Sequence, residues 1–238
     1  MKVGANVDNM EFDIDHDFGD EPETKSKLGF HIGFITDISL IENTLSIQPA
    51  LLYSNKGYSF DMEKMLEDEL DQYDLNMKNY EGYVKVNYDY IELPINFVCK
   101  NGGFQVSAGP YFAIGIGGAF KSNFSFIVDG EKYDEDDFFE EDSYILQPVL
   151  GEVDDDMIEN YFEDDDDVYE LYCAYDFGFN FGVGYQVKSI LFNVGYSLGL
   201  ANLTPEYDTE DYDYYEDYTE NVIQKNSVLT FSTSYFFN

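Results

Sequence analysis

Apolar residues alternate with small or polar residues along much of the chain. Between residues 175 and 187 every second residue is aromatic or β-branched, and the residues between them include three glycines and an asparagine. The same two-residue period returns over residues 104–117, 190–201 and 229–237. A period of two is typical of a β-strand whose two faces meet different surroundings. In the clearest segment the apolar face carries Tyr175, Phe177, Phe179, Phe181, Val183, Tyr185 and Val187.

The alternation predicts eight strands in a single domain over residues 1–238. We expect them at roughly 1–7, 27–39, 45–60, 83–100, 103–128, 171–187, 190–202 and 225–237. The connections alternate in length, with tight turns at 40–44, 101–102 and 188–189 and long loops at 8–26, 61–82, 129–170 and 203–224. Short turns on one rim and long loops on the other are typical of an antiparallel, up-and-down transmembrane β-barrel of the bacterial outer membrane. The even strand number leaves both termini at the short-turn rim.

Side-chain size favours this barrel over a soluble one, such as a lipocalin, whose strands also alternate. The lumen of an eight-stranded barrel is just wide enough for side chains to fill it. One face of the predicted strands carries glycine, Gln105, Ser107, Asn180 and Asn193, whereas the other is a band of large apolar side chains. That band would overfill the lumen, so we expect it to face lipid, with the soluble ligand-binding barrel as the alternative.

The negative charge is confined to the predicted long loops. The chain has 49 acidic residues and 12 lysines, for a net charge of −37, and the four loops hold 44 of the acids and four of the lysines. This charge argues against binding nucleic acid, because a polyanion gains affinity by pairing with basic residues. It also argues against docking on anionic lipid through an exposed surface. Divalent cations and basic protein partners stay open.

Two further features concern export and cysteine chemistry. No run of about 18 apolar residues is present, which excludes a transmembrane helix. No apolar segment follows Met1 and Lys2 as in a secretory signal, so we expect the numbering to describe a mature or trimmed chain. Cys99 and Cys173 fall near opposite rims of the predicted barrel, too far apart for a disulfide, and we predict two free thiols.

Seven segments in order along the chain cover the whole predicted barrel and leave out only the long loops. They are KVGANV (2–7), LSIQPALLYSNKG (45–57), YIELPINF (90–97), GGFQVSAGPYFAIGIGG (102–118), YDFGFNFGVGYQV (175–187), FNVGYSLGLANLTP (192–205) and NSVLTFSTSYFFN (226–238). Together they resemble the eight-stranded outer-membrane barrel family of Bacteroidetes, often called PorT-like. The resemblance implies export, insertion by the barrel-assembly machinery through the aromatic last strand with Tyr235, Phe236 and Phe237, and an association with protein secretion.

A polar network is expected inside the barrel. Buried charges must be paired or hydrogen-bonded, and the residues of inward parity that would form the network are Lys56, Glu92, Lys100, Asp176 and Asn180. Members of the resembled family often carry an acidic residue after Gln-Pro in the third strand, where this chain has Ala50, so the extent of the network is an open question. The network either fills the lumen as a plug or forms a path for protons or ions.

Clustered carboxylates in the loops are candidates for weak calcium binding. Asp13, Asp15 and Asp17 resemble the opening of an EF-hand, but Gly19 comes one position late and Thr24 stands where the motif needs Glu. The other candidates are Asp164, Asp165, Asp166 and Asp167, a plain charge run that is more often solvated than ligating. No cofactor is expected.

Catalysis is not expected, because His16 and His31 are the only histidines and neither lies in a catalytic motif. Met62, Met65, Leu66, Leu70 and Tyr73 recur at helical spacing, which predicts a short amphipathic helix over the rim. The tyrosines of residues 207–218 are interleaved with acid. This segment could either bind a basic protein surface or extend the last two strands above the membrane.

These observations predict a non-enzymatic, membrane-anchored scaffold that presents acidic loops to a protein partner, with outer-membrane lipid around its wall. The alternative is narrow transport or lipid handling through the interior.

Overall fold

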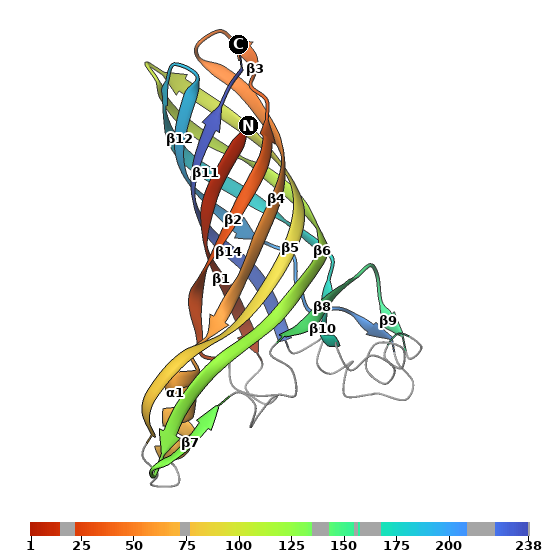
Figure 1. Ribbon diagram of the computed structural model, residues 1–238. Coiled ribbons are helices and arrows are strands. Elements are labelled where there is room, and N and C mark those ends of the chain that lie inside the picture. Colours follow the sequence, from red (N-terminus) through yellow and green to blue (C-terminus); the bar gives the residue numbers. More distant parts are fainter. Residues whose placement is uncertain are drawn as a thin grey trace.

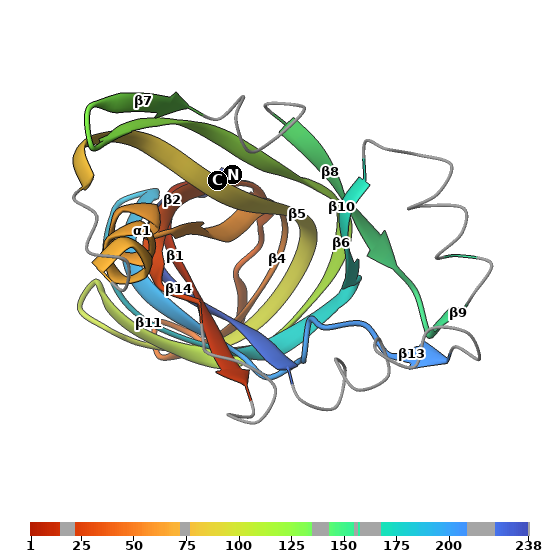
Figure 2. The ribbon, with the colours of Figure 1, turned by 90° about the horizontal axis from the view of Figure 1, so that it is seen from below.

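Eight strands pair side by side into a closed barrel (Figures 1 and 2). The computed structural model describes residues 1–14, 22–71, 77–134, 143–154, 157, 168–208 and 222–237. The ring closes because β1 pairs with both β2 and β14, and β5 pairs with both β4 and β6. In chain order the ring strands are β1 (Lys2–Ile14), β2 (Thr24–Ile35), β4 (Leu45–Phe60), β5 (Met77–Asn101), β6 (Phe104–Val128), β11 (Tyr175–Val187), β12 (Ile190–Gly199) and β14 (Val222–Tyr235).

The large apolar side chains point out of this barrel, as predicted. Along β11, Phe177, Phe179 and Phe181 are each about half exposed, whereas Asp176, next to Phe177, is buried. The soluble alternative needs the apolar face inside the barrel and is therefore wrong. The all-β barrel fold is confirmed.

Both termini and the tight turns lie at one end of the barrel (Figure 1). The β5–β6 turn places Gly102 at φ 56° and Gly103 at φ 93°, a left-handed backbone that glycine adopts without a steric penalty. The expected strand over 27–39 stops earlier, because β2 ends at Ile35 and a separate short strand, β3 (Ile38–Ile41), pairs with β4.

At the opposite end the predicted long loops contain more regular structure than the sequence indicated. β5 and β6 continue far beyond the other ring strands as a long paired ribbon (Figure 1). The expected strands over 1–7 and 83–100 are too short, because pairing with neighbouring strands carries β1 on to Ile14 and starts β5 at Met77, whereas the expected end of the strand over 103–128 agrees with β6. The further elements there are β7 (Glu131–Asp134), β8 (Ser143–Val149), β9 (Val153–Asp154), β10 (Val168–Cys173) and β13 (Tyr207–Asp208).

The predicted rim helix is confirmed as α1 (Met62–Asp71), although Tyr73 lies outside the described residues. Asp61 caps the helix, because its carboxylate accepts a hydrogen bond from the backbone N–H of Lys64 at 3.3 Å. Lys25 of β2 lies 2.6 Å from the same carboxylate. Partial burial alone would raise the pKa of Asp61. The hydrogen bonds from Lys25 and the Lys64 backbone outweigh this effect, so the pKa of Asp61 is lowered. On the other face of α1, Met62 and Leu66 pack against the core.

The core occupies the half of the lumen near the long-loop end. It is rich in aromatic side chains contributed by β4, β5, β6 and β10. Within the described residues, no helix is long and apolar enough to cross a membrane. Cys99 and Cys173 are both free, as predicted.

Candidate functional site

A buried lysine paired with two carboxylates lies at the centre of the barrel interior. Lys56 of β4 places its Nζ 3.0 Å from Glu92 Oε2 on β5 and 3.1 Å from Asp176 Oδ2 on β11. All three side chains are buried. Alternate residues of a strand face opposite sides of the sheet, and these three face the interior. The closure of the sheet brings Lys56 and Asp176, which are 120 positions apart, into contact. We call these three residues the ion cluster.

Neutral donors complete the hydrogen bonding of Asp176. The Tyr111 hydroxyl donates to Oδ1 at 3.0 Å, and the Asn226 side-chain amide donates to Oδ2 at 2.9 Å. The Lys56 ammonium also lies 4.7 Å from the centre of the Tyr111 ring and 5.2 Å from that of Tyr90, within the range of a cation–π contact. The lysine therefore has charged or aromatic partners from three different strands.

Tyrosine rings fill the lumen beside the ion cluster. Tyr172 of β10 meets Tyr88 edge-on, with ring centres 4.8 Å apart, and donates its hydroxyl to the Gly117 carbonyl at 2.8 Å. The ring passes so close to Gly115 that a Cβ there would lie 2.6 Å from the Tyr172 hydroxyl. Gly115 therefore makes room for a side chain that comes from outside the eight-stranded ring.

A second polar group lies toward the short-turn end. His31 Nδ1 is 2.7 Å from Asn6 Oδ1, and the Asn6 amide donates to Ser54 at 3.3 Å. These residues, together with Lys56 and Glu92 of the ion cluster, border a cavity of about 40 Å³. A cavity of this size holds a few water molecules at most. Asn180 also lines it, and its Oδ1 has no protein partner among the described residues.

Two more charged side chains are buried where β1 and β2 pair. Asp8 and Lys27 are opposite each other in register. The Lys27 ammonium donates to Asn55 Oδ1 at 2.8 Å and to the Lys56 carbonyl at 3.0 Å. Neither Asp8 oxygen has a hydrogen-bond partner among the described residues.

Lys100 was expected in the interior network, and this expectation is wrong. Its ammonium pairs with Asp37 at the short-turn rim, where both side chains are about one-fifth exposed. Lys100 has inward parity, but it lies eight residues along β5 from Glu92, which is roughly 26 Å of strand. Glutamines separate this rim from the interior, with Gln105 donating to Gln186 at 2.6 Å.

Most of the loop residues singled out in the sequence lie outside the described part of the chain. Asp15, Asp17, Asp164 to Asp167 and His16 are among them. Asp13 is exposed near the end of β1. The described residues contain no group of three potential metal ligands, and the calcium hypothesis stays a prediction.

The tyrosine rings that fill the lumen were not predicted from the sequence. Tyr88 and Tyr90 share the inward parity of Glu92, so alternation alone would have placed them beside it. Tyr172 shares the parity of Asp176 within the expected strand over 171–187, although in the structure it reaches the lumen from the separate strand β10. In the described interior His31 pairs with an amide rather than with a nucleophile, so this arrangement provides no activated nucleophile.

A closed sheet with an apolar exterior and a polar interior defines a transmembrane β-barrel. Residues 1–204 match the family model described as "Outer membrane protein beta-barrel domain", and the chain belongs to this family of the bacterial outer membrane. No curated protein matches the chain.

Three solved structures are similar to the chain. The attachment invasion locus protein Ail of Yersinia pestis, crystallised with the heparin analogue sucrose octasulfate, is 11% identical, with 99% of this chain and 95% of that chain covered and a TM-score of 0.39. Neisserial surface protein A is 10% identical, with 99% and 96% covered and a TM-score of 0.39. The Pseudomonas putida (P. putida) toluene transporter TodX is 10% identical, with 100% and 90% covered and a TM-score of 0.22.

The ion cluster predicts that removing one of its charges lowers the free energy of unfolding much more than removing all three. Lys56→Met leaves two buried carboxylates without their cation and should lower the free energy of unfolding by about 3–5 kcal/mol. The triple variant Lys56→Met/Glu92→Gln/Asp176→Asn removes all three charges and should recover most of that loss. Urea titration of the folded chain in detergent micelles measures both.

Lys188→Met, on an exposed turn, is the control and should change stability by less than about 0.5 kcal/mol. Equal stability of Lys56→Met and the wild type would contradict the cluster's role.

Proposed function

We propose that this protein is an outer-membrane anchor that presents an acidic extracellular rim to a basic protein partner, with a barrel interior closed to solutes. The observation that carries the proposal is the filled lumen. The ion cluster, the tyrosines around it and the glutamines at the short-turn end leave an internal cavity of only about 40 Å³. Narrow transport needs a continuous path, and an eight-stranded barrel leaves none once its interior side chains are packed.

The distribution of charge supports the partner surface. Nearly all the acid of the chain belongs to segments beyond the wall at the long-loop end. Clustered charge of one sign steers an oppositely charged protein toward it and speeds association. The extended ribbon of β5 and β6, together with α1, projects beyond the wall at this end (Figure 1). Resemblance to PorT-like barrels suggests a component of a secretion assembly as the partner, and insertion would use the barrel-assembly machinery.

The closed interior predicts an electrically silent barrel. Wild-type protein inserted into planar lipid bilayers should give no sustained single-channel conductance, because no continuous water path crosses the lumen. The variant Tyr88→Ala/Tyr111→Ala/Tyr172→Ala, which removes three interior rings, serves as the positive control and should give conducting events. Sustained conductance by the wild type would refute the anchor and favour transport.

The acidic rim predicts salt-sensitive binding of a basic peptide. Wild-type protein in nanodiscs of zwitterionic lipid should bind a ten-lysine peptide, and Asp164→Asn/Asp165→Asn/Asp166→Asn/Asp167→Asn should bind it more weakly because four charges are gone. Binding should weaken as ionic strength rises, since exposed charges are screened within about 8–10 Å at physiological salt. Surface plasmon resonance measures the affinities, with a ten-glutamate peptide as the negative control. Equal binding by wild type and variant would contradict the proposal.

A further inference from the structure

A row of lysines crosses the outer surface of the barrel where the apolar wall ends. Strand pairing sets Lys25 of β2 opposite Ser59 of β4, and Ser59 opposite Lys85 of β5. Lys85 is opposite Lys121 of β6, which is in turn opposite Ser143 of β8. We call Lys25, Lys85 and Lys121 the lysine row. It is a product of register, because the three residues come from distant parts of the chain.

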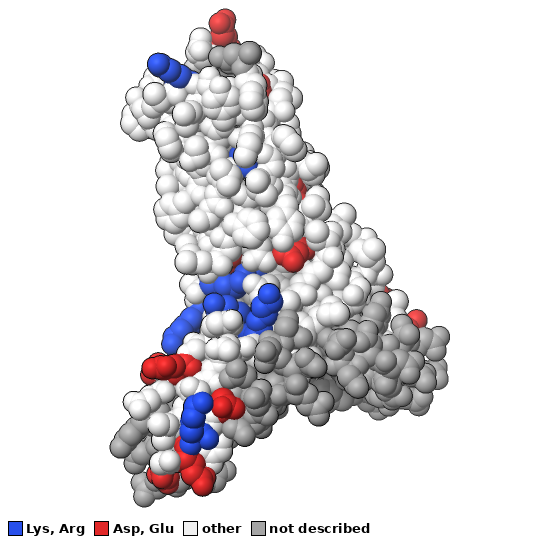
Figure 3. All heavy atoms as spheres, in the orientation of Figure 1, with Lys and Arg blue, Asp and Glu red and all other residues white. Residues whose placement is uncertain are grey.

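The lysine row lies just beyond the membrane-facing part of the wall. The last exposed apolar side chains below it are Ile91 on β5 and Ile116 on β6. Lys85 and Lys121 follow within five or six residues, which is about 20 Å along a strand and less along the membrane normal, because the strands tilt. Figure 3 shows lysine side chains gathered where the pale wall meets the lower extension.

Two of the three lysines lack a carboxylate partner among the described residues. Lys25 is paired with Asp61, whereas no ion pair forms at Lys85 or Lys121 in the described part of the chain. The Lys85 ammonium instead lies 3.9 Å from the centre of the Tyr83 ring. Like charges directly opposite each other in a sheet are destabilising. An anion between Lys85 and Lys121 would remove that repulsion.

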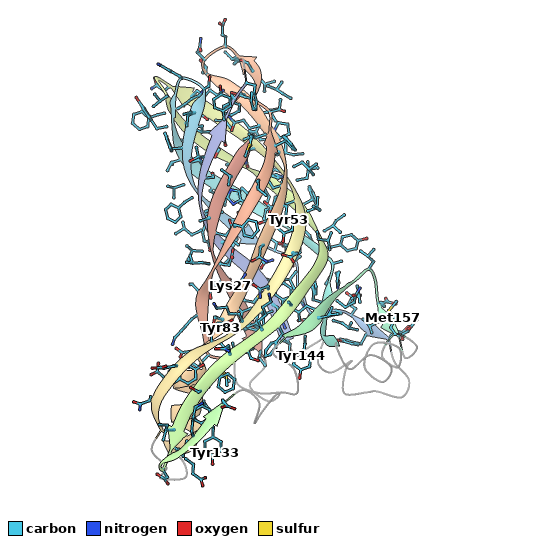
Figure 4. All side chains as sticks on the ribbon, in the orientation of Figure 1. Lys27, Tyr53, Tyr83, Tyr133, Tyr144 and Met157 are labelled. Atoms are coloured by element: carbon cyan, nitrogen blue, oxygen red, sulfur yellow. The ribbon has the colours of Figure 1, made fainter. Side chains whose placement is uncertain are left out.

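The nearest carboxylate on the membrane side of the row is already engaged. Asp89 accepts hydrogen bonds from the Tyr53 hydroxyl and the Asn55 amide, each at 2.7 Å. Figure 4 shows Tyr53 above Tyr83 along the barrel. Tyrosines with an apolar body and a polar tip suit the membrane–water boundary. These tyrosines would suit a lipid headgroup layer beside the row.

We propose that Lys85 and Lys121 bind the phosphate of an anionic outer-leaflet lipid whose acyl chains lie on the wall below them. A lipid suits the site better than free phosphate, because only a lipid also contacts the apolar side chains of Ile91, Ile114 and Ile116. The net charge of −37 argued against such contact through an exposed surface. However, exposed charges are screened beyond about 8–10 Å at physiological salt, so the adjacent lysines dominate at the row itself. This site adds a lipid contact to the anchor and does not depend on the partner at the rim.

Lipid binding to the full-length protein tests the site. Folded protein in neutral detergent micelles is titrated with dioleoyl phosphatidic acid or dioleoyl phosphatidylcholine, and native mass spectrometry counts the bound lipids. Wild type should prefer the phosphatidic acid, and Lys85→Gln/Lys121→Gln should lose affinity for it on the order of tenfold, since each lysine near an anionic surface contributes to the attraction. The control Lys132→Gln/Lys188→Gln removes two positive charges elsewhere and should bind as the wild type does.

A second variant separates lipid binding from folding. Lys121→Glu places a carboxylate opposite Lys85, so it should be at least as stable as wild type to urea in neutral micelles and yet lose the preference for phosphatidic acid. Millimolar inorganic phosphate should not displace the bound lipid. The proposal is overturned if wild type shows no preference, if the control loses as much affinity as the double variant, or if inorganic phosphate displaces the lipid and so marks a site for free anions.

Discussion

Every property of this barrel depends on the need to satisfy backbone hydrogen bonds in hydrocarbon. Lipid offers no partner for an open sheet edge, so the sheet must close on itself. Here closure joins the two ends of the chain, because β1 pairs with β14 from Lys2 opposite Ser234 to Ile14 opposite Val222. Once eight strands are closed, the lumen is narrow and alternate side chains must fill it. The small and polar inward face and the large apolar outward face follow from that geometry.

The narrow lumen leads to the ion cluster and to the function we propose. Three buried charges are tolerated because Lys56 contacts Glu92 and Asp176, and because Tyr111 and Asn226 donate further hydrogen bonds to the latter. With the interior occupied, the surface that we propose for partner binding is the long-loop end. Along the barrel axis toward this end, the nearly neutral wall is followed first by the lysine row and then by the acidic segments. Each zone suits a different neighbour: acyl chains, lipid phosphate and a basic protein.

The alternation of residues correctly predicted which face of the sheet each side chain occupies. It could not predict how far along the barrel axis a residue lies or which residue of the neighbouring strand it is paired with. Phe179 and Asn180 reveal the two faces of β11 because their surroundings differ so strongly. Lys100 shows the limit, because parity assigned its face correctly but could not tell how far along the lumen it lies. The start of β5 was not predicted because the alternation is interrupted there: Asn79 has a φ of 55°, and the pairing with β6 shifts between Lys78 and Glu81. The lysine row was hidden for another reason: only strand pairing reveals that Lys85 and Lys121 are opposite each other.

The central claim is that the apolar exterior of the closed barrel faces lipid. The most direct test compares folding of the purified chain with and without an amphiphile, followed by circular dichroism and size-exclusion chromatography. The account predicts a β-rich, monodisperse protein in detergent or lipid, and aggregation in plain buffer, because exposed residues such as Phe112, Phe179 and Phe231 would meet water. A β-rich, monodisperse protein in plain buffer would contradict it.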